Sequence, residues 1–223
     1  MGTNKLQRFE EIGEFENVFE LTDYQDNDVK KPKGNWHKKV FGNSNPIILE
    51  LACGKGAYTL ELARRNPDKN FIGVDIKGAR IWKGAKRARS EKLDNLRFLR
   101  IYIDHLDEYF APGEVDDIWI TFPDPYPKYS DRSKRLTSPK FLDIYKSVLK
   151  SDGYIHLKTD SDKLFKYTRK VIKDWECPVK KVVQNIYEEC PDDELLTIQT
   201  FYEKRHIEAG KTIKFLSFGL PVS

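Results

Sequence analysis

Short apolar runs alternate with helical periodicity along most of this chain, and this alternation limits the possible folds more than any other feature. It is typical of a parallel sheet whose strands are joined by right-handed helical crossovers. We therefore expect an α/β fold. The predicted strands are 45–51, 71–76, 95–101, 115–122 and 152–159, and the predicted helices are 58–65, 78–92, 139–150 and 162–175.

Residues 179–186 and 212–220 complete the pattern as strands, and no helical pattern between them is strong enough to separate them. Because a crossover helix is missing, we expect these two strands to pair antiparallel at the sheet edge. The sequence thus predicts a mostly parallel, seven-stranded sheet with an antiparallel edge strand.

The chain has 223 residues, which is enough for one domain with a sizeable core. Residues 1–33 are polar and largely without periodicity, so we expect a loosely docked N-terminal arm, followed by a single domain over residues 34–223. No run approaches the roughly 18 apolar residues of a membrane span, and the N-terminus lacks the apolar region of a secretory signal. We expect a cytoplasmic protein.

The three cysteines, Cys53, Cys177 and Cys190, are widely spaced, and the four histidines are scattered. Neither a disulfide framework nor a zinc site has such spacing. We expect no structural metal.

The turn "ELACGKGAY" follows the first strand, and its small residues allow a ligand to approach the backbone closely. The second strand ends in Asp75, whose carboxylate suits the two hydroxyls of a ribose. A dehydrogenase is disfavoured because no third glycine follows Gly54 and Gly56 at the required place. These observations favour a nucleotide-type ligand over a plain tight turn beside a solvated Asp.

The fourth predicted strand runs into "TFPDPYPKYSDRSKR". Pro123 and Pro125 restrict the backbone on both sides of Asp124. In an open parallel sheet the ligand crevice lies beyond the carboxyl ends of the strands, so we expect this carboxylate at the crevice.

Positive charge is concentrated in "KGARIWKGAKRARSEK" at 77–92 and again within 128–150, although the net charge is only +4. Clustered Lys and Arg indicate a phosphate-bearing partner, while a solvated helix face is the alternative for the first cluster. The candidate RNA-backbone contacts in the second cluster are Arg132, Lys134 and Arg135. The first cluster offers Lys77, Arg80, Lys83, Lys86, Arg87 and Arg89 as a second basic patch.

The motif "ELACGKG" resembles the first motif of class I methyltransferases, which bind S-adenosylmethionine in a Rossmann-like fold. This resemblance implies that Glu50 lies near the methionine end of the cofactor and Asp75 on its ribose. It also implies that Asp104 meets the adenine, although a helix N-cap is an equal alternative for that residue. Such families often have Gly where this chain has Ala52, whose Cβ requires a negative φ.

The segment "PDPYPKYSDRSKRL" is similar to the corresponding segment of the bacterial tRNA (guanine-N7)-methyltransferase family. The motifs "FIGVDIKGARI", "NLRFL", "HLKTD" and "TFYEKRHIEAGKTI" recur in that family in the same order, so the resemblance covers residues 36–218. "DPYP" is also loosely similar to the Asn/Asp-Pro-Pro-aromatic motif of enzymes that methylate exocyclic amines.

The resemblance to the tRNA family implies methyl transfer to N7 of a guanine at position 46, in the variable loop of tRNA. It assigns Asp124 as the catalytic residue that also contacts the cofactor. The residues it assigns to the substrate are Lys128, Asp160, Thr200, Phe201, Tyr202 and Glu203. The family more often has Trp in place of Tyr126, so this ring either stacks on guanine or packs the loop.

Guanine N7 carries a free lone pair and no proton, so its methylation requires no general base. This agrees with the resemblance, which assigns no His or Cys nucleophile. Two alternatives stay open at this point: a methyltransferase for exocyclic amines, and a non-catalytic tRNA-binding protein on the same scaffold. The sequence leaves a monomer and a homodimer equally possible.

Overall fold

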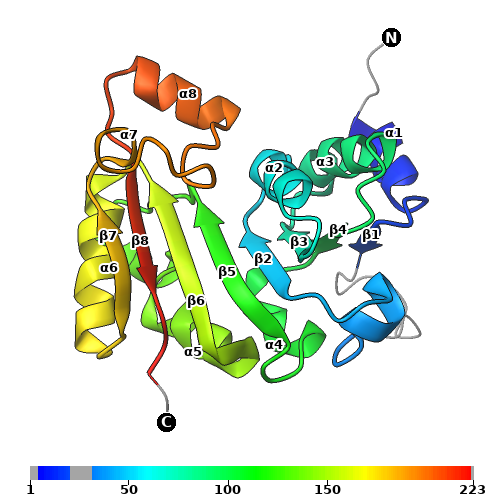
Figure 1. The fold of residues 1–223 in the computed structure, drawn as a ribbon, viewed down its shortest axis with the longest axis horizontal. Coiled ribbons are helices and arrows are strands. Elements are labelled where there is room, and N and C mark those ends of the chain that lie inside the picture. Colours follow the sequence, from blue (N-terminus) through cyan, green and yellow to red (C-terminus); the bar gives the residue numbers. More distant parts are fainter. Residues whose placement is uncertain (1–4, 21–31, 222–223) are drawn as a thin grey trace.

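The computed structural model describes residues 5–20 and 32–221. Over these ranges the chain forms one eight-stranded sheet in the order β1-β4-β3-β2-β5-β6-β8-β7 (Figure 1). The strands are β1 (Val18–Glu20), β2 (Ile47–Leu51), β3 (Asn70–Val74), β4 (Leu96–Arg100), β5 (Val115–Thr121), β6 (Leu149–Thr159), β7 (Val179–Val183) and β8 (Lys214–Phe218).

The helices are α1 (Lys5–Ile12), α2 (Ala57–Arg65), α3 (Gly78–Ser90), α4 (Leu106–Tyr109), α5 (Pro139–Val148), α6 (Asp162–Asp174), α7 (Ile186–Glu189) and α8 (Phe201–Glu208). Three further helical turns are η1 (Trp36–Phe41), η2 (Ile103–His105) and η3 (Tyr129–Lys134). The predicted α/β class is therefore confirmed, and each predicted strand and helix is present with small shifts of its ends.

The pairing from β1 to β6 is parallel, whereas β8 runs antiparallel to both β6 and β7. The expected antiparallel pair at the sheet edge is thus confirmed. Two details differ from the sequence analysis: β1 adds an eighth strand at the other edge, and helices α7 and α8 separate β7 from β8. The short β1 has too few residues to show a period.

Part of the predicted N-terminal arm is packed on the sheet and its helices. Helix α1 lies against α3, where the Trp82 indole donates a 2.8 Å hydrogen bond to Glu11. Ile12 is fully buried, and β1 pairs with β4. Residues 5–20 are therefore packed more firmly than the loosely docked arm that we expected, because Ile12 and Phe15 are buried and Phe9, Val18 and Phe19 are partly buried. The rest of that arm, apart from residues 32–33, lies outside the described residues.

The central strands are largely apolar, as expected where both faces of a sheet are covered. All residues of β2 and β3 are buried, as expected for parallel strands between two helical layers. Helices α1, α2 and α3 cover one face, and α4, α5 and α6 cover the other. The amphipathic helix α6 shows the reason clearly, because its buried residues recur at helical spacing from Leu164 to Ile172.

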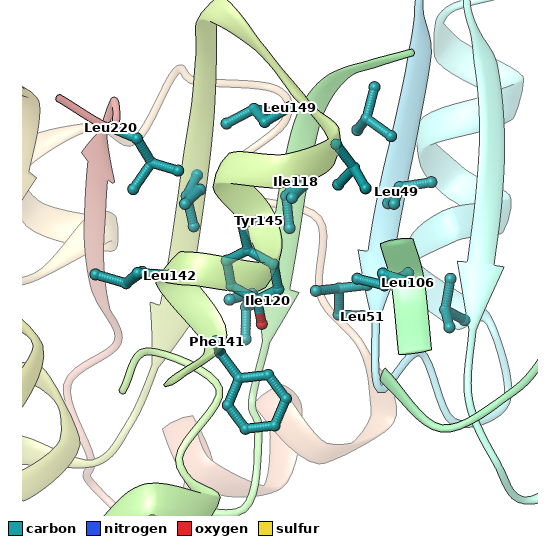
Figure 2. Close-up of a cluster of buried hydrophobic side chains, with 14 of the residues drawn as sticks. Leu49, Leu51, Leu106, Ile118, Ile120, Phe141, Leu142, Tyr145, Leu149 and Leu220 are labelled. Carbon is teal, nitrogen blue, oxygen red and sulfur yellow. The ribbon is translucent and has the colours of Figure 1, made fainter. Parts of the chain in front are cut away.

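Helix α5 connects the core to the loop that follows β5. Its side chains Leu142 and Tyr145 pack over Ile118 and Ile120 of β5 (Figure 2). The Tyr145 hydroxyl donates a 2.9 Å hydrogen bond to the carbonyl of Leu136, at the end of that loop. The packing of α5 in the core therefore fixes the position of the loop that follows β5.

Candidate functional site

A cavity of about 400 Å³ lies at the carboxyl ends of β2, β3, β4 and β5. These ends meet at the switch point between β2 and β5, because helix α2 after β2 and helix α4 after β4 lie on opposite faces of the sheet. Such a switch point is the usual ligand site of these folds. The loop after β5 and the start of α5 form the remaining wall. The charged residues that line the cavity are Asp75, Lys77, Arg80, Asp104, Asp124, Lys134 and Lys140.

The turn between β2 and α2 is formed by residues with left-handed backbone conformation. Gly54 and Gly56 have φ of 59° and 65°. At Gly56 a Cβ would lie 2.6 Å from the Phe98 ring, so a larger residue does not fit there. Ala52 lines the cavity with a φ of 56°, which contradicts the expectation of a negative φ. The turn therefore imposes a positive φ on Ala52, although the Cβ of Ala disfavours that conformation.

Asp75 follows β3 and is fixed by two backbone amides. The N–H of Gly54 donates to one carboxylate oxygen at 2.9 Å, and the N–H of Lys77 donates to the other at 2.8 Å. The residue is 6% exposed and lines the cavity. Each carboxylate oxygen keeps a further lone pair, so this side chain can still accept hydrogen bonds from two ligand hydroxyls.

Glu50 lies in β2, just before the turn, and its carboxylate accepts hydrogen bonds from protein groups. One of its oxygens accepts bonds from the Thr59 amide at 2.9 Å and from the Thr59 hydroxyl, and the other accepts from the Thr121 hydroxyl at 2.5 Å. Burial raises the pKa of Glu50 to about 7, although these bonds act to lower it. Glu50, Gly54 and Gly56 do not line the cavity, whereas the other predicted cofactor residues do.

Asp104 lies in η2, at the wall of the cavity, and forms an ion pair with Lys140 of α5. The alternative of a helix N-cap is not seen, since His105 occupies the N-cap position of α4. Lys140 was not among the predicted site residues. The sequence does not show that Lys140 of α5 lies next to Asp104, because only the fold brings these two residues together.

Asp124 is held by an unusual backbone. Phe122 and Tyr126, which each precede a proline, have φ of 48° and 42°, a conformation that non-glycine residues rarely adopt. The Asp124 side chain is exposed, lines the cavity and makes no hydrogen bond or ion pair within the described residues. Its carboxylate is therefore positioned by strained backbone rather than by partners, which is common at functional sites.

The basic residues after Asp124 have two different environments. Lys128 and Arg132 are exposed, and the Arg132 guanidinium stacks on the Tyr129 ring at 4.1 Å. Lys134 is also exposed, and its 2.8 Å hydrogen bond to Asp131 raises the pKa of the lysine. These three side chains are accessible to an anionic partner.

Arg135 is different, because it is only 8% exposed. It donates two hydrogen bonds to the Tyr126 carbonyl, at 3.2 and 2.9 Å, and stacks on the Tyr167 ring at 4.2 Å. The contact of Arg135 with an RNA backbone stays a prediction, and in this structure its guanidinium is occupied by protein groups. This residue holds the loop that carries Asp124.

The second basic patch lies on α3 and just before it. Lys77 and Arg80 line the cavity, and the remaining members are exposed. The Lys86 ammonium lies 4.7 Å from the centre of the Trp82 ring. The patch therefore continues outward from the cavity along the helix surface.

Helix α8 lies at the carboxyl end of β5 and β6 (Figure 1). Thr200 is its N-cap and accepts a 3.3 Å hydrogen bond from the Glu203 amide. Phe201 and Tyr202 are 64% and 51% exposed, so both rings are accessible to a substrate. Glu203 is fully buried against Lys158 of β6, so its carboxylate is occupied by a protein partner in this structure, and its substrate contact stays a prediction.

Asp160 connects α8 to the end of β6. Its carboxylate lies 2.6 Å from Lys211 Nζ and 3.4 Å from His206 Nδ1. The His206 ring stacks on Phe122 with a centroid separation of 5.8 Å. Asp160 and Asp124 therefore belong to adjoining parts of one surface, with Phe122 between them.

Across residues 5–20 and 32–221, no group of three or more His, Cys, Asp or Glu side chains is placed to hold a metal ion. Over the same ranges, no helix has the length and apolar character needed to cross a membrane.

Comparison with known proteins assigns this chain to a family. A family model described as "Putative methyltransferase" matches residues 44–216. A tRNA (guanine-N(7)-)-methyltransferase of Christiangramia forsetii is 50% identical over 221 residues, covering 96% of this chain and 97% of the relative. The chain belongs to the tRNA (guanine-N(7)-)-methyltransferase family.

Other members of the family are also similar along most of the chain. The enzyme of Bacteroides thetaiotaomicron is 45% identical over 222 residues, which are 99% of this chain and 87% of that protein. The enzyme of Streptococcus thermophilus is 36% identical over 181 residues, with 81% and 83% covered. The family resemblance seen in the sequence motifs is confirmed.

Solved structures agree with the class I methyltransferase fold of the family. The 16S rRNA methyltransferase KamB has a TM-score of 0.63 at 14% identity, covering 82% of this chain and 92% of that one. A 16S rRNA (adenine(1408)-N(1))-methyltransferase of Catenulisporales acidiphilia, solved with its cosubstrate, has a TM-score of 0.59 at 15% identity, covering 83% and 92%. At such identities the likeness concerns the fold alone.

Proposed function

We propose that this protein transfers a methyl group from S-adenosylmethionine to N7 of a guanine in tRNA, at position 46 in the variable loop. Family membership supports this function, because the similar proteins are named for this reaction. We also propose that residues 34–223 form the methyltransferase domain and that the enzyme acts in the cytoplasm.

The cavity at the strand ends fits the proposed cofactor. Asp75 offers its carboxylate to the ribose hydroxyls, and Asp104 offers one to the adenine amine once Lys140 is displaced or shared. Gly54 and Gly56 form the turn beside the cavity, and Glu50 stabilises the turn through its hydrogen bonds with Thr59 at the start of α2. When bound, the cofactor supplies a sulfonium methyl group.

Asp124 is the proposed catalytic residue because its exposed carboxylate lines the same cavity without a protein partner. Guanine N7 needs no proton removed, so the carboxylate acts by positioning the base and by stabilising the positive charge that develops on it. The N1 and N2 edge of guanine carries N–H donors, which a carboxylate accepts and which adenine lacks at the same positions. Asp160 is proposed to assist from the other side of Phe122, as a substrate contact.

The remaining substrate contacts are proposed on the surface around these carboxylates. Phe201 and Tyr202 are large exposed rings on α8, and such rings stack on unpaired bases. Lys128, Arg132 and Lys134 are accessible to RNA phosphates. Thr200 fixes the start of α8, and so the direction of the two rings.

The observation that carries the proposal is an unpartnered carboxylate at the ligand crevice, next to exposed basic residues and rings. The test is methylation of unmodified tRNA transcripts with labelled cofactor, followed by mapping of the modified position. We expect a product that is cleaved by mild reduction and aniline at position 46. A product resistant to this cleavage would indicate an exocyclic amine instead, and tRNA binding without methylation would indicate a non-catalytic protein.

A further inference from the structure

The loop that carries Asp124 begins at Phe122, which lines the active-site cavity. The φ of Phe122 is 48°, a conformation that the Cβ of a non-glycine residue disfavours. Its N–H donates a 2.8 Å hydrogen bond to the Lys158 carbonyl, and the Lys158 ammonium lies 5.9 Å from the centre of its ring. A strained residue persists only where its surroundings hold it, so the contacts of Phe122 determine where the loop begins.

His206, in the last turn of α8, provides one of these contacts. Its ring stacks on the Phe122 ring, with the centroids 5.8 Å apart and the planes inclined by 21°, within the range of offset aromatic pairs. The rings of Phe201 and Tyr202, on the same helix, are exposed. Helix α8 therefore packs one ring against the catalytic loop and leaves two rings for the substrate.

Polar groups fix the orientation of the His206 ring. Lys211 Nζ lies 3.3 Å from His206 Nδ1 and 2.6 Å from the Asp160 carboxylate, so it bridges the two side chains. An ammonium group only donates hydrogen bonds, so Nδ1 is the acceptor here. The Asp160 carboxylate itself lies 3.4 Å from the same nitrogen. These contacts limit rotation of the ring and keep its face against Phe122.

The loop is held at both ends by groups from different elements. At its far end Arg135 donates two hydrogen bonds to the Tyr126 carbonyl. At its near end His206 contacts Phe122. The Asp124 carboxylate between these ends makes no hydrogen bond or ion pair within the described residues, so its place depends on how the two ends are held. Of the two, only the His206 contact comes from the helix with the exposed rings.

We infer that His206 is a positioning residue for the methyl transfer. It joins α8 to the catalytic loop, so that a base stacked on Phe201 and Tyr202 is kept in a fixed relation to the Asp124 carboxylate. His206 does not line the cavity, so it acts through Phe122. A small misplacement of a group that orients the reactants lowers the rate strongly. The inference rests on the proposed function, in which Asp124 positions the guanine.

Three substitutions separate the ring of His206 from its nitrogen. His206→Ala removes both, His206→Gln keeps an acceptor for Lys211 without a ring, and His206→Phe keeps a ring that stacks on Phe122. The rate of methyl transfer to tRNA transcripts is measured over a range of tRNA concentrations, with the cofactor Kd by calorimetry. We expect kcat to fall about threefold to tenfold for His206→Ala and His206→Gln, and to stay within about twofold for His206→Phe. The KM for tRNA and the cofactor Kd should not change.

Glu208→Ala is the matched control, because Glu208 is exposed on the same helix and makes no hydrogen bond or ion pair within the described residues. Its kcat should equal that of the unaltered protein, and thermal unfolding checks that every variant is folded at the assay temperature. A raised KM with unchanged kcat for His206→Ala would make His206 a substrate contact and overturn the inference. Equal losses of kcat in His206→Phe and His206→Ala would also overturn it.

The assay counts methyl groups on tRNA at any position, which separates this inference from the proposed function. Transfer to an atom other than guanine N7 would contradict the proposed function and leave the comparison of the variants valid. Full kcat in His206→Ala and His206→Gln, beside an active unaltered protein, would overturn the inference alone. No transfer by the unaltered protein would overturn both.

Discussion

Lys158 and Glu203 form an ion pair from which solvent is fully excluded. Lys158 Nζ lies 2.8 Å from both carboxylate oxygens, and Tyr187 donates a further 2.7 Å hydrogen bond to Glu203. Burial lowers the pKa of Lys158 and raises that of Glu203, and their mutual attraction opposes both shifts. The pair joins α8 to β6, so the helix with the exposed Phe201 and Tyr202 depends on it for its position.

Removal of one partner of this pair should be strongly destabilising. Glu203→Ala leaves the Lys158 ammonium buried without a counter-charge, and we expect a loss of about 3–5 kcal/mol in the free energy of unfolding. Urea denaturation measures it. Replacing both partners, as Lys158→Met with Glu203→Leu, should cost clearly less than Glu203→Ala alone. The control is Lys211→Ala, because the pair of Lys211 with Asp160 is half exposed and should contribute below about 1 kcal/mol. Equal losses in the single and double variants would contradict the interpretation.

Glu50 should make stability depend on pH. Its pKa is about 7 in the folded protein against an ordinary value of 4.5, so the folded state holds the proton more tightly. This contribution is fully present below pH 4.5 and is lost as pH rises to about 7, with a total of about 3 kcal/mol. Glu50→Gln should remove this dependence. Denaturation of both proteins between pH 4.5 and 8 gives the difference, and parallel curves would exclude the effect.

Asp124→Ala should lower the rate of methyl transfer without changing the stability of the fold. Because the side chain is exposed and unpartnered, the free energy of unfolding should change by less than about 0.5 kcal/mol. The rate of methyl transfer under single-turnover conditions should fall by about 10²–10³ or more. Thermal unfolding and labelled-methyl transfer provide the two measurements. Turnover close to that of the unaltered enzyme would remove Asp124 from the catalytic role.

Arg132 and Arg135 form a matched pair of substitutions in one loop. Arg132→Ala removes an exposed charge, so tRNA binding should weaken and its salt slope should fall by about one. Arg135→Ala removes the bonds to the Tyr126 carbonyl, so stability and methyl transfer should fall while the salt slope stays the same. Binding isotherms at several salt concentrations distinguish the two. A reduced salt slope for Arg135→Ala would show that this residue contacts phosphate after all.

Ala52→Gly should stabilise the protein. The left-handed conformation costs Ala about 1–2 kcal/mol and costs Gly almost nothing, while the extra freedom of Gly in the unfolded chain offsets part of this gain. We expect a net gain of roughly 0.5–1 kcal/mol in the free energy of unfolding, measured by urea titration. Ala52→Val, with a branched side chain at the same φ, should lose stability. A loss for Ala52→Gly would show that the φ of 56° carries no strain.

The layered sheet and the acidic strand ends could be predicted because they depend on local patterns. Apolar runs such as Ile47–Leu51 reveal buried strands, and Asp75 and Asp124 follow such runs directly. Helix α8 could not be predicted, since its buried residue is the charged Glu203 and its two rings, Phe201 and Tyr202, are exposed. The spacing of apolar residues therefore does not reveal this helix.

The exact roles of individual charges depended on tertiary partners that no local pattern shows. Arg135 lies in the same basic segment as Arg132, yet only Arg135 contacts the Tyr126 carbonyl and the Tyr167 ring. A weak signal existed for the buried ion pair, because Lys158 lies in a predicted strand, directly after Leu157 in "HLKTD". A lysine at such a position requires an acidic partner, which the fold supplies from α8.

Because β8 lies between β6 and β7, this part of the sheet can form only after the last strand has been synthesised. Strand β8 pairs with both neighbours, so β6 keeps one unpaired edge and β7 has no partner strand until residues 214–218 have emerged. Until then the nascent chain exposes an open strand edge, which favours association with other chains. A protein truncated before Lys214 should therefore aggregate rather than accumulate as a smaller folded enzyme.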